Sequence, residues 1–184
     1  MKLSCLQADA LRMLCESIVW THKIHEKQAD IFLRRSSRYR LIANVLLAVS
    51  ASGILAAILI DERLLNVFSA LLMAASFVVS VHRDSSNYEA LAYEHASYAK
   101  EYLKLRERAT KLIVRLDCEN DCSSWLDDYE SLQNDYLLVC EHAPRTSEKA
   151  VKEAGRAIKQ GDEPSLNELL DMLIQKTEGG SADD

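Results

Sequence analysis

The feature that most constrains this chain is a pair of long apolar segments separated by only three residues. The first, residues 41–60, reads LIANVLLAVSASGILAAILI, and the second, residues 64–81, reads LLNVFSALLMAASFVVSV. As helices they are about 30 and 27 Å long, close to the thickness of the hydrocarbon core of a bilayer. The connection Asp61-Glu62-Arg63 is so short that the helices must run antiparallel. The sequence therefore predicts a transmembrane helical hairpin over residues 41–81.

The distribution of charge agrees with this hairpin. The net charge of the 184 residues is −6, but residues 1–40 carry eight basic and four acidic side chains, whereas residues 82–184 carry thirteen basic and twenty-two acidic ones. Five glycines and two prolines are too few for a turn-rich β-sandwich or a disordered low-complexity chain. No basic stripe with interleaved aromatic residues is present, so direct nucleic-acid binding is not expected. We expect an all-α protein whose membrane hairpin continues into a cytoplasmic helical stalk or bundle.

Basic residues beside the apolar segments predict the orientation of the hairpin. Arg34, Arg35, Arg38 and Arg40 precede the first segment, and Arg83 follows the second. The positive-inside rule then places both termini in the cytoplasm. The four N-terminal arginines have a second interpretation, as contacts to an anionic ligand or to lipid headgroups. A cleaved signal peptide is not expected, because the first apolar segment begins forty residues into the chain and is too long for a signal core.

Helical periodicity divides the rest of the chain. An amphipathic helix, with Met13 and Trp20 on its apolar stripe and Leu11 and Ile18 beside it, runs directly into the first span. A continuous helix is predicted from Ser85 to Leu116, then one with Ser124 as N-cap and Pro144 as stop, and then two short helices and an acidic tail. The short helices are expected over residues 147–160 and 165–176. The resulting regions are 1–40, 41–81 (spans 41–60 and 64–81), 82–145 and 146–184.

Small and polar residues recur at helical spacing inside both apolar segments. Such residues let membrane helices approach closely and form hydrogen bonds across an interface, and they also line cavities. Two interpretations stay open: helix packing, within the hairpin or between subunits, and the lining of a pore in an oligomer. The candidate residues are Asn44, Ser52, Asn66, Ser69, Ser76 and Ser80. Asp61 and Glu62 would form a ring at the outer mouth of such a pore or, alternatively, a simple solvated turn.

Motifs for catalysis are missing from the sequence. We find no phosphate-binding glycine-rich loop, no metalloprotease motif and no nucleophile elbow, so we predict no catalytic residue, no cofactor and no enzyme activity. Zinc is a minority interpretation, because the spacing does not match a zinc knuckle and free cysteines are often buried small hydrophobes. The possible zinc ligands are Cys118, Cys122, Cys140 and His142. For His22, His25 and His95, packing within the helical bundle is the preferred interpretation.

The order of these elements resembles a known family. A long helix with a basic end precedes two closely linked spans, and the next helix carries Tyr-x2-Leu-Ala-Tyr-x-His-x2-Tyr over residues 88–98. A helix rich in Trp, Tyr and Leu then ends at Glu141-His-Ala-Pro144. This pattern resembles the SLATT family, two-span membrane proteins of bacterial conflict and antiphage systems, over about residues 5–145. The two C-terminal helices are expected to lie outside the resemblance.

The resemblance implies an effector of the bacterial inner membrane. Such proteins are thought to form homo-oligomers and to permeabilise the membrane when a partner reports infection, and the partner is often a nucleotide second-messenger synthase or a reverse transcriptase. If an anionic messenger binds directly, the available cations include Arg34, Arg35, Arg38, Lys100, Lys104, Arg106 and Arg108. The alternative functions are a non-conducting membrane scaffold whose cytoplasmic helices recruit a partner, and a small zinc-dependent sensor or enzyme.

Overall fold

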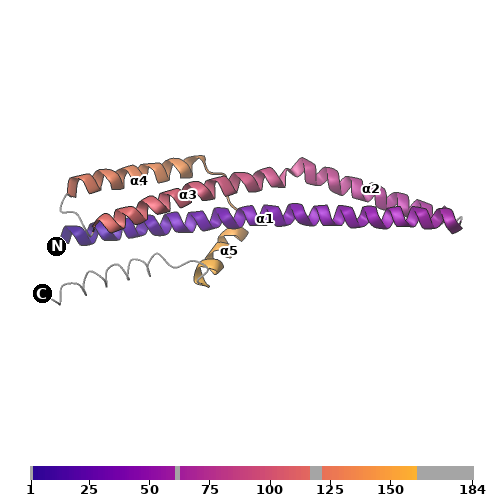
Figure 1. The fold of residues 1–184 in the computed structure, drawn as a ribbon, viewed down its shortest axis with the longest axis horizontal. Helices are drawn as coiled ribbons and strands as arrows, with labels where there is room; N and C mark the ends of the chain where they lie inside the picture. Colours follow the sequence, from indigo (N-terminus) through magenta and orange to yellow (C-terminus); the bar gives the residue numbers. More distant parts are fainter. Residues whose placement is uncertain (1, 61–62, 117–121, 161–184) are drawn as a thin grey trace. The chain divides into compact units, whose positions relative to one another are not determined.

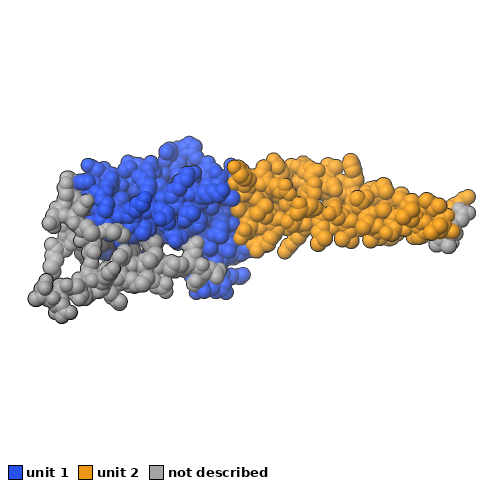
Figure 2. Space-filling model, viewed as in Figure 1, with its two compact units in different colours: residues 1–28, 94–184 blue, residues 29–93 orange. Residues whose placement is uncertain are grey.

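The described part of the chain is all-α, as the sequence predicts. The computed structural model describes residues 2–60, 63–116 and 122–160, and these ranges contain helices and no strand. The helices are α1 (Lys2–Ile60), α2 (Arg63–Ser86), α3 (Tyr88–Leu116), α4 (Cys122–His142) and α5 (Glu148–Lys159) (Figure 1). They form two compact units (Figure 2). Unit 1 comprises residues 1–28 and 94–184, and unit 2 comprises residues 29–93.

Helix α1 runs without a break from Lys2 to Ile60. This confirms that the N-terminal amphipathic helix continues directly into the first apolar segment. The segment contains no proline, and Gly53 is its single glycine. Because glycine is tolerated in membrane helices, no residue in α1 forces a break.

The second apolar segment ends differently, because Asn87 separates α2 from α3. Asn87 has φ 46°, in the left-handed region that asparagine tolerates better than most residues with a side chain. Its N–H donates to the carbonyl of Asp84 at 3.3 Å, and its own carbonyl accepts from the N–H of Leu91 at 3.1 Å. The predicted continuous helix from Ser85 to Leu116 is therefore wrong at its start, since α3 begins at Tyr88.

The core of unit 1 is built by α1, α3 and α4. Its buried residues are Leu11, Leu14, Cys15 and Ile18 from α1, Tyr102, Leu105, Ala109, Leu112 and Ile113 from α3, and Trp125 and Leu132 from α4. Tyr102, Leu105, Ala109 and Leu112 follow one another at intervals of three or four residues, so they lie on one face of α3. In α1 the predicted stripe is rotated, because Met13 and Trp20 are 63% and 39% exposed. The buried face contains His22, Lys23, His25 and Gln28 instead, and a hydropathy pattern does not count such residues as core.

The observed ends of α4 and α5 differ from the predicted helix limits at the start of α4 and agree with them elsewhere. Helix α4 begins at Cys122, so Ser124 lies inside the helix and is not its N-cap. The helix ends before Pro144, as predicted. In α5, the Ser147 hydroxyl accepts from the N–H of Ala150, and Gln160 is the C-cap. The predicted helix at 165–176 and the acidic tail lie outside the described residues, as do residues 117–121 between α3 and α4.

Unit 2 contains the hairpin formed by the second part of α1 and by α2. Two helical segments of the described chain are long and apolar enough to cross a membrane, one within α1 and one that begins with α2. The most apolar eighteen-residue windows of these segments are 17% and 11% buried, whereas the core helix of a soluble protein is mostly buried. This exposed apolar surface needs an apolar solvent, so the hairpin is a membrane hairpin. The span limits 41–60 and 64–81 stay a prediction. Unit 2, residues 29–93, is defined by packing and extends beyond these limits on both sides, so it does not mark where the spans end.

Replacing Leu132 by alanine is expected to lower the free energy of unfolding by about 2–5 kcal/mol, because its side chain is fully buried in unit 1. Leu137→Ala in the same helix is the matched control, and since Leu137 is 55% exposed we expect a change below about 0.5 kcal/mol. Thermal and urea unfolding of the full chain in detergent, followed by circular dichroism, measures both. Equal losses for the two variants would contradict the packing of α4.

Candidate functional site

Two serine hydroxyls cross from one helix of the hairpin to the other. Ser50 Oγ donates to the carbonyl of Ser69 at 2.6 Å, and Ser76 Oγ donates to the carbonyl of Ala43 at 2.8 Å. All four residues are buried. The pairs are seven residues apart on each helix, so two helical turns separate the two hydrogen bonds. They fix the antiparallel register of α1 and α2 in unit 2.

Gly53 lies where α1 and α2 approach each other closely. A Cβ atom at this position would lie 2.2 Å from Ser69 Oγ, which is well inside van der Waals contact. Small residues allow such close packing between membrane helices, where burial from water supplies no driving force. Ala43, Ser50 and Ala57 follow the same face of α1 at seven-residue intervals, and each is at most 5% exposed.

The predicted polar stripe therefore separates into two groups. Ser69 and Ser76 face α1 and belong to the packing of the hairpin. The other members point elsewhere: Asn44, Ser52 and Asn66 are exposed, Ser80 is half-buried, and Ser52 donates to the carbonyl of Ala48 in its own helix. Asp61 and Glu62 lie outside the described residues.

Sequence reasoning missed Ser50, because it does not lie on the four-residue row of Asn44 and Ser52. Ser50, Gly53 and Ala57 are small residues separated by three and then four positions, and this spacing would have predicted Ser50 as part of the helix interface. Those three residues share one helical face.

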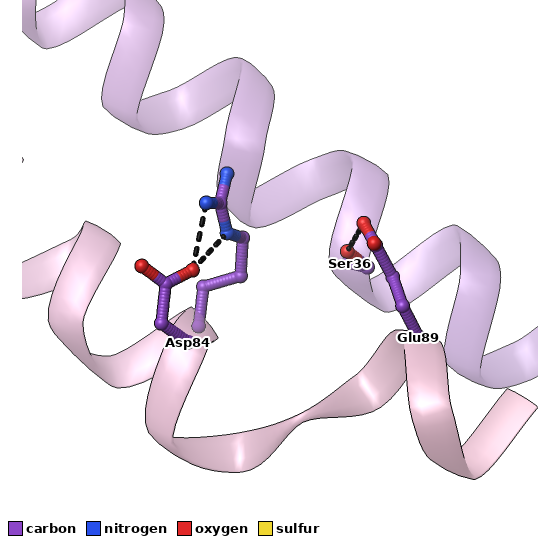
Figure 3. Close-up of polar contacts among 4 residues, drawn as sticks. Ser36, Asp84 and Glu89 are labelled. Atoms are coloured by element: carbon purple, nitrogen blue, oxygen red, sulfur yellow. Dashed lines mark hydrogen bonds and ion pairs between the residues drawn. The ribbon is translucent and has the colours of Figure 1, made fainter.

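A small polar pocket lies in unit 2 at the connection between α2 and α3. It has a volume of about 80 Å³, and its lining consists of Ser36, Arg83, Asp84, Asn87, Tyr88 and Glu89. Asp84 and Glu89 stand on either side of the connection, and Glu89 reaches Ser36 on α1 (Figure 3). Ser36 Oγ donates to Glu89 Oε1 at 2.9 Å, and Arg83 donates twice to Asp84 Oδ1, at 2.9 and 2.7 Å. We call this cavity the junction pocket.

An aromatic cluster adjoins the junction pocket. The rings of Tyr39 and Tyr88 stack with centroids 5.8 Å apart, and Phe32 lies 6.2 Å from Tyr88. The guanidinium of Arg35 lies 5.5 Å from the Tyr88 ring centre. Tyrosines at this position are typical of the boundary between membrane and water.

The four arginines before the first span do not line the junction pocket. Arg35 contacts Tyr88, and the side chains of Arg34, Arg38 and Arg40 are exposed. The guanidinium in the pocket comes from Arg83, whose predicted role was to orient the hairpin in the membrane.

Unit 1 contains a buried pair of histidines. His25 Nδ1 and His95 Nδ1 are 3.1 Å apart, and the two side chains are 3% and 2% exposed. His22 Nδ1 is 2.8 Å from the carbonyl of Ala99. Burial, then the neighbouring His95 and His22, lowers the pKa of His25 to about 4. Their packing role confirms the preferred interpretation of these histidines.

A zinc site is not supported by the described residues, because they contain no group of three His, Cys, Asp or Glu side chains able to hold a metal ion. Tyr102 donates its hydroxyl hydrogen to Cys140 Sγ at 3.5 Å, and His142 Nδ1 contacts the carbonyl of Leu138 at 2.9 Å. Cys118 and the side chain of Cys122 lie outside what the structure describes.

The fold and the hairpin define the class, an α-helical membrane protein with two closely linked spans. The chain belongs to the SLATT family: residues 8–169 match the family described as SMODS and SLOG-associating 2TM effector domain family 4. This match supports a membrane effector of conflict systems. It includes α5, so the expectation that both C-terminal helices lie outside the resemblance is wrong. Comparison with curated proteins and with solved structures finds no match.

Gly53→Ala is expected to destabilise the hairpin, because the new methyl group would meet Ser69 Oγ. We expect a loss of about 1–3 kcal/mol, typical of an overpacked interface. Adding Ser69→Ala should restore much of this stability, since the Ser69 Cβ lies at an acceptable 3.4 Å from the position that the new methyl group would take. Thermal unfolding and protease resistance in detergent measure the single and double variants. A double variant that is no more stable than Gly53→Ala would show that this contact is not the cause.

Acidification is expected to destabilise unit 1 between about pH 6.5 and pH 4. The folded His25 has a pKa of about 4 and stays neutral in this window, whereas the unfolded histidine, at its ordinary 6.5, takes up a proton. The contribution to stability is therefore complete above pH 6.5 and decreases as the pH falls toward 4. The melting temperature in detergent at several pH values measures this slope.

The variant that tests this slope replaces both members of the pair, His25→Phe with His95→Phe. It should flatten the pH dependence of the melting temperature, while His142→Gln, a change at an exposed histidine, should leave it unchanged. A flat wild-type curve would contradict the assignment of the slope to His25.

Proposed function

We propose that this protein is the membrane effector of a bacterial antiphage defence system. On activation by a nucleotide signal or a partner protein, it oligomerises and permeabilises the inner membrane, so that the infected cell stops growing, an abortive infection. A second-messenger synthase or a reverse transcriptase is the kind of partner that would supply the signal. Membership of a family of two-span effector domains and the apolar hairpin of unit 2 support this proposal.

The formation of an oligomer is supported by two side-chain amides that lie on the outer surface of the hairpin. Ser50 and Ser76 find hydrogen-bond acceptors inside the hairpin, but the side chains of Asn44 and Asn66 are exposed on its apolar surface. An amide in hydrocarbon without a partner costs about 2–7 kcal/mol. Contact with a second hairpin removes this cost, because an amide both donates and accepts. In a closed ring of hairpins each asparagine would face its counterpart on a neighbouring hairpin or a central channel.

Activation requires a ligand that prefers one state of the protein. With both termini in the cytoplasm, unit 1 would receive the signal. Two of the cations available to an anionic messenger are already paired in the structure: Arg108 with Asp135, and Lys104 with Glu101. A messenger at these sites would have to replace exposed ion pairs, which contribute little to stability.

The test replaces the two outward amides and leaves the hairpin packing intact. Asn44→Leu with Asn66→Leu should slow depolarisation about tenfold or more, because each interhelical hydrogen bond contributes about 1 kcal/mol and recurs in every subunit. The matched control is Val45→Leu with Val67→Leu, which changes the adjacent exposed positions. The measurement is the membrane potential of cells after induction of the protein together with its activator.

Two outcomes contradict the proposal. Growth arrest with retained membrane potential would favour the alternative, a non-conducting scaffold that recruits a partner to the membrane. Equal depolarisation by the asparagine variant and the valine control would exclude the amides from the conducting state. Replacement of Ser69 or Ser76 by leucine is unsuitable here, because both serines are buried in the hairpin and the change would disrupt its packing.

A further inference from the structure

The junction pocket lies where the headgroups of the bilayer would be. Ser36 is five residues before Leu41, and Arg83 is two residues after Val81. At a rise of 1.5 Å per residue they lie roughly 7 and 3 Å outside the apolar segments, within the layer of about 5–8 Å that headgroups occupy on each side. This placement depends on the membrane position of the hairpin and not on pore formation.

The lining of the pocket carries charges of both signs. Arg83 contributes a guanidinium, Asp84 and Glu89 contribute carboxylates, and Ser36 and Asn87 add neutral hydrogen-bonding groups. The lining has a net charge of −1, so it disfavours a ligand with negative charge alone, and a ligand with positive charge alone would bind to the carboxylates without using the guanidinium. A small zwitterion satisfies both, with a phosphate toward Arg83 and an ammonium toward Glu89.

The aromatic neighbours decide which ammonium fits. A quaternary ammonium binds to open aromatic faces, but the Tyr88 ring is already stacked on Tyr39 and covered by Arg35. A primary ammonium has three donors and binds to carboxylates, which the pocket supplies. The chemistry therefore favours ethanolamine over choline.

We propose that the junction pocket binds a phosphoethanolamine group, as the headgroup of phosphatidylethanolamine in the surrounding bilayer. The lipid phosphate pairs with Arg83, and its ammonium pairs with Glu89 and Asp84. The pairs that now occupy these side chains, Arg83 with Asp84 and Ser36 with Glu89, are replaced in part. Ser36 belongs to α1, and the other lining residues belong to the end of α2, to Asn87 and to the start of α3. The bound headgroup therefore links α1 to the junction of α2 and α3 within unit 2.

The experiment measures lipid binding to the full chain without its activator, so its outcome is independent of depolarisation. Native mass spectrometry from detergent compares phosphatidylethanolamine, phosphatidylcholine and phosphatidylglycerol, titrated separately. We expect phosphatidylethanolamine to bind about tenfold more tightly than the other two, since it alone makes both sets of charge-assisted hydrogen bonds. Equal binding of phosphatidylethanolamine and phosphatidylcholine overturns the proposal.

Glu89→Gln is the decisive variant, because it removes the negative charge and keeps an oxygen that accepts from Ser36. It should abolish most of the preference for phosphatidylethanolamine, while the melting temperature stays that of the wild type. Glu107→Gln, at an exposed carboxylate of α3 outside the pocket lining, is the matched control and should keep the preference. A retained preference in Glu89→Gln overturns the assignment of the ammonium site.

A second arm separates the lipid from a soluble ligand. Glycerophosphoethanolamine presents the same headgroup without acyl chains, and at micromolar concentration it should not compete with phosphatidylethanolamine. Competition at that concentration would identify a free phosphoethanolamine compound as the ligand and overturn the lipid assignment. Arg83→Gln should weaken all three lipids alike, because each contains the phosphate; unchanged binding would exclude Arg83 from the site.

Discussion

The hydrogen bonds from Ser50 and Ser76 to carbonyls of the facing helix are the contacts on which the hairpin depends. In a bilayer, apolar side chains gain nothing by leaving lipid for one another, so close packing and polar contacts must hold the helices together. The close approach at Gly53 brings the backbones near enough for the serine hydroxyls to reach carbonyl oxygens. The small residues therefore allow the serine hydroxyls to form these hydrogen bonds, and both features together stabilise the hairpin.

Unit 1 is stabilised by a different force. Its core of leucine, isoleucine and aromatic residues is removed from water, which provides a hydrophobic driving force that the hairpin lacks. The buried polar residues of α1 fit this core because they find partners: His25 lies beside His95, and the Gln28 side-chain oxygen accepts from the N–H and the hydroxyl of Ser147. The two units therefore respond to different perturbations, unit 1 to acid and core truncation, and the hairpin to changes at small residues.

The sequence was sufficient for the class of fold because hydropathy and helical periodicity are strong over long segments. It located the end of α3 at Leu116 and the limits of the short helix α5, where the apolar pattern and the residue type agree. It placed Met13 and Trp20 on the apolar stripe of α1, although both are exposed, because the buried face also contains polar residues that a hydropathy pattern does not count as core. It also failed at Asn87, since a single residue in a left-handed conformation leaves no periodic signal. The junction pocket was missed for the same reason, as it forms at that break.

The position of the break between α2 and α3 has a physical cause. Inside hydrocarbon, every backbone N–H and C=O must be paired within the helix, and each unpaired group costs several kcal/mol. Asn87 lies six residues beyond Val81, where water and headgroups can satisfy such groups. The chain therefore changes direction after the second apolar segment and not within it. A polar pocket at this site follows from the same constraint, because the end of one helix and the start of the next bring Asp84, Asn87 and Glu89 together outside the hydrocarbon.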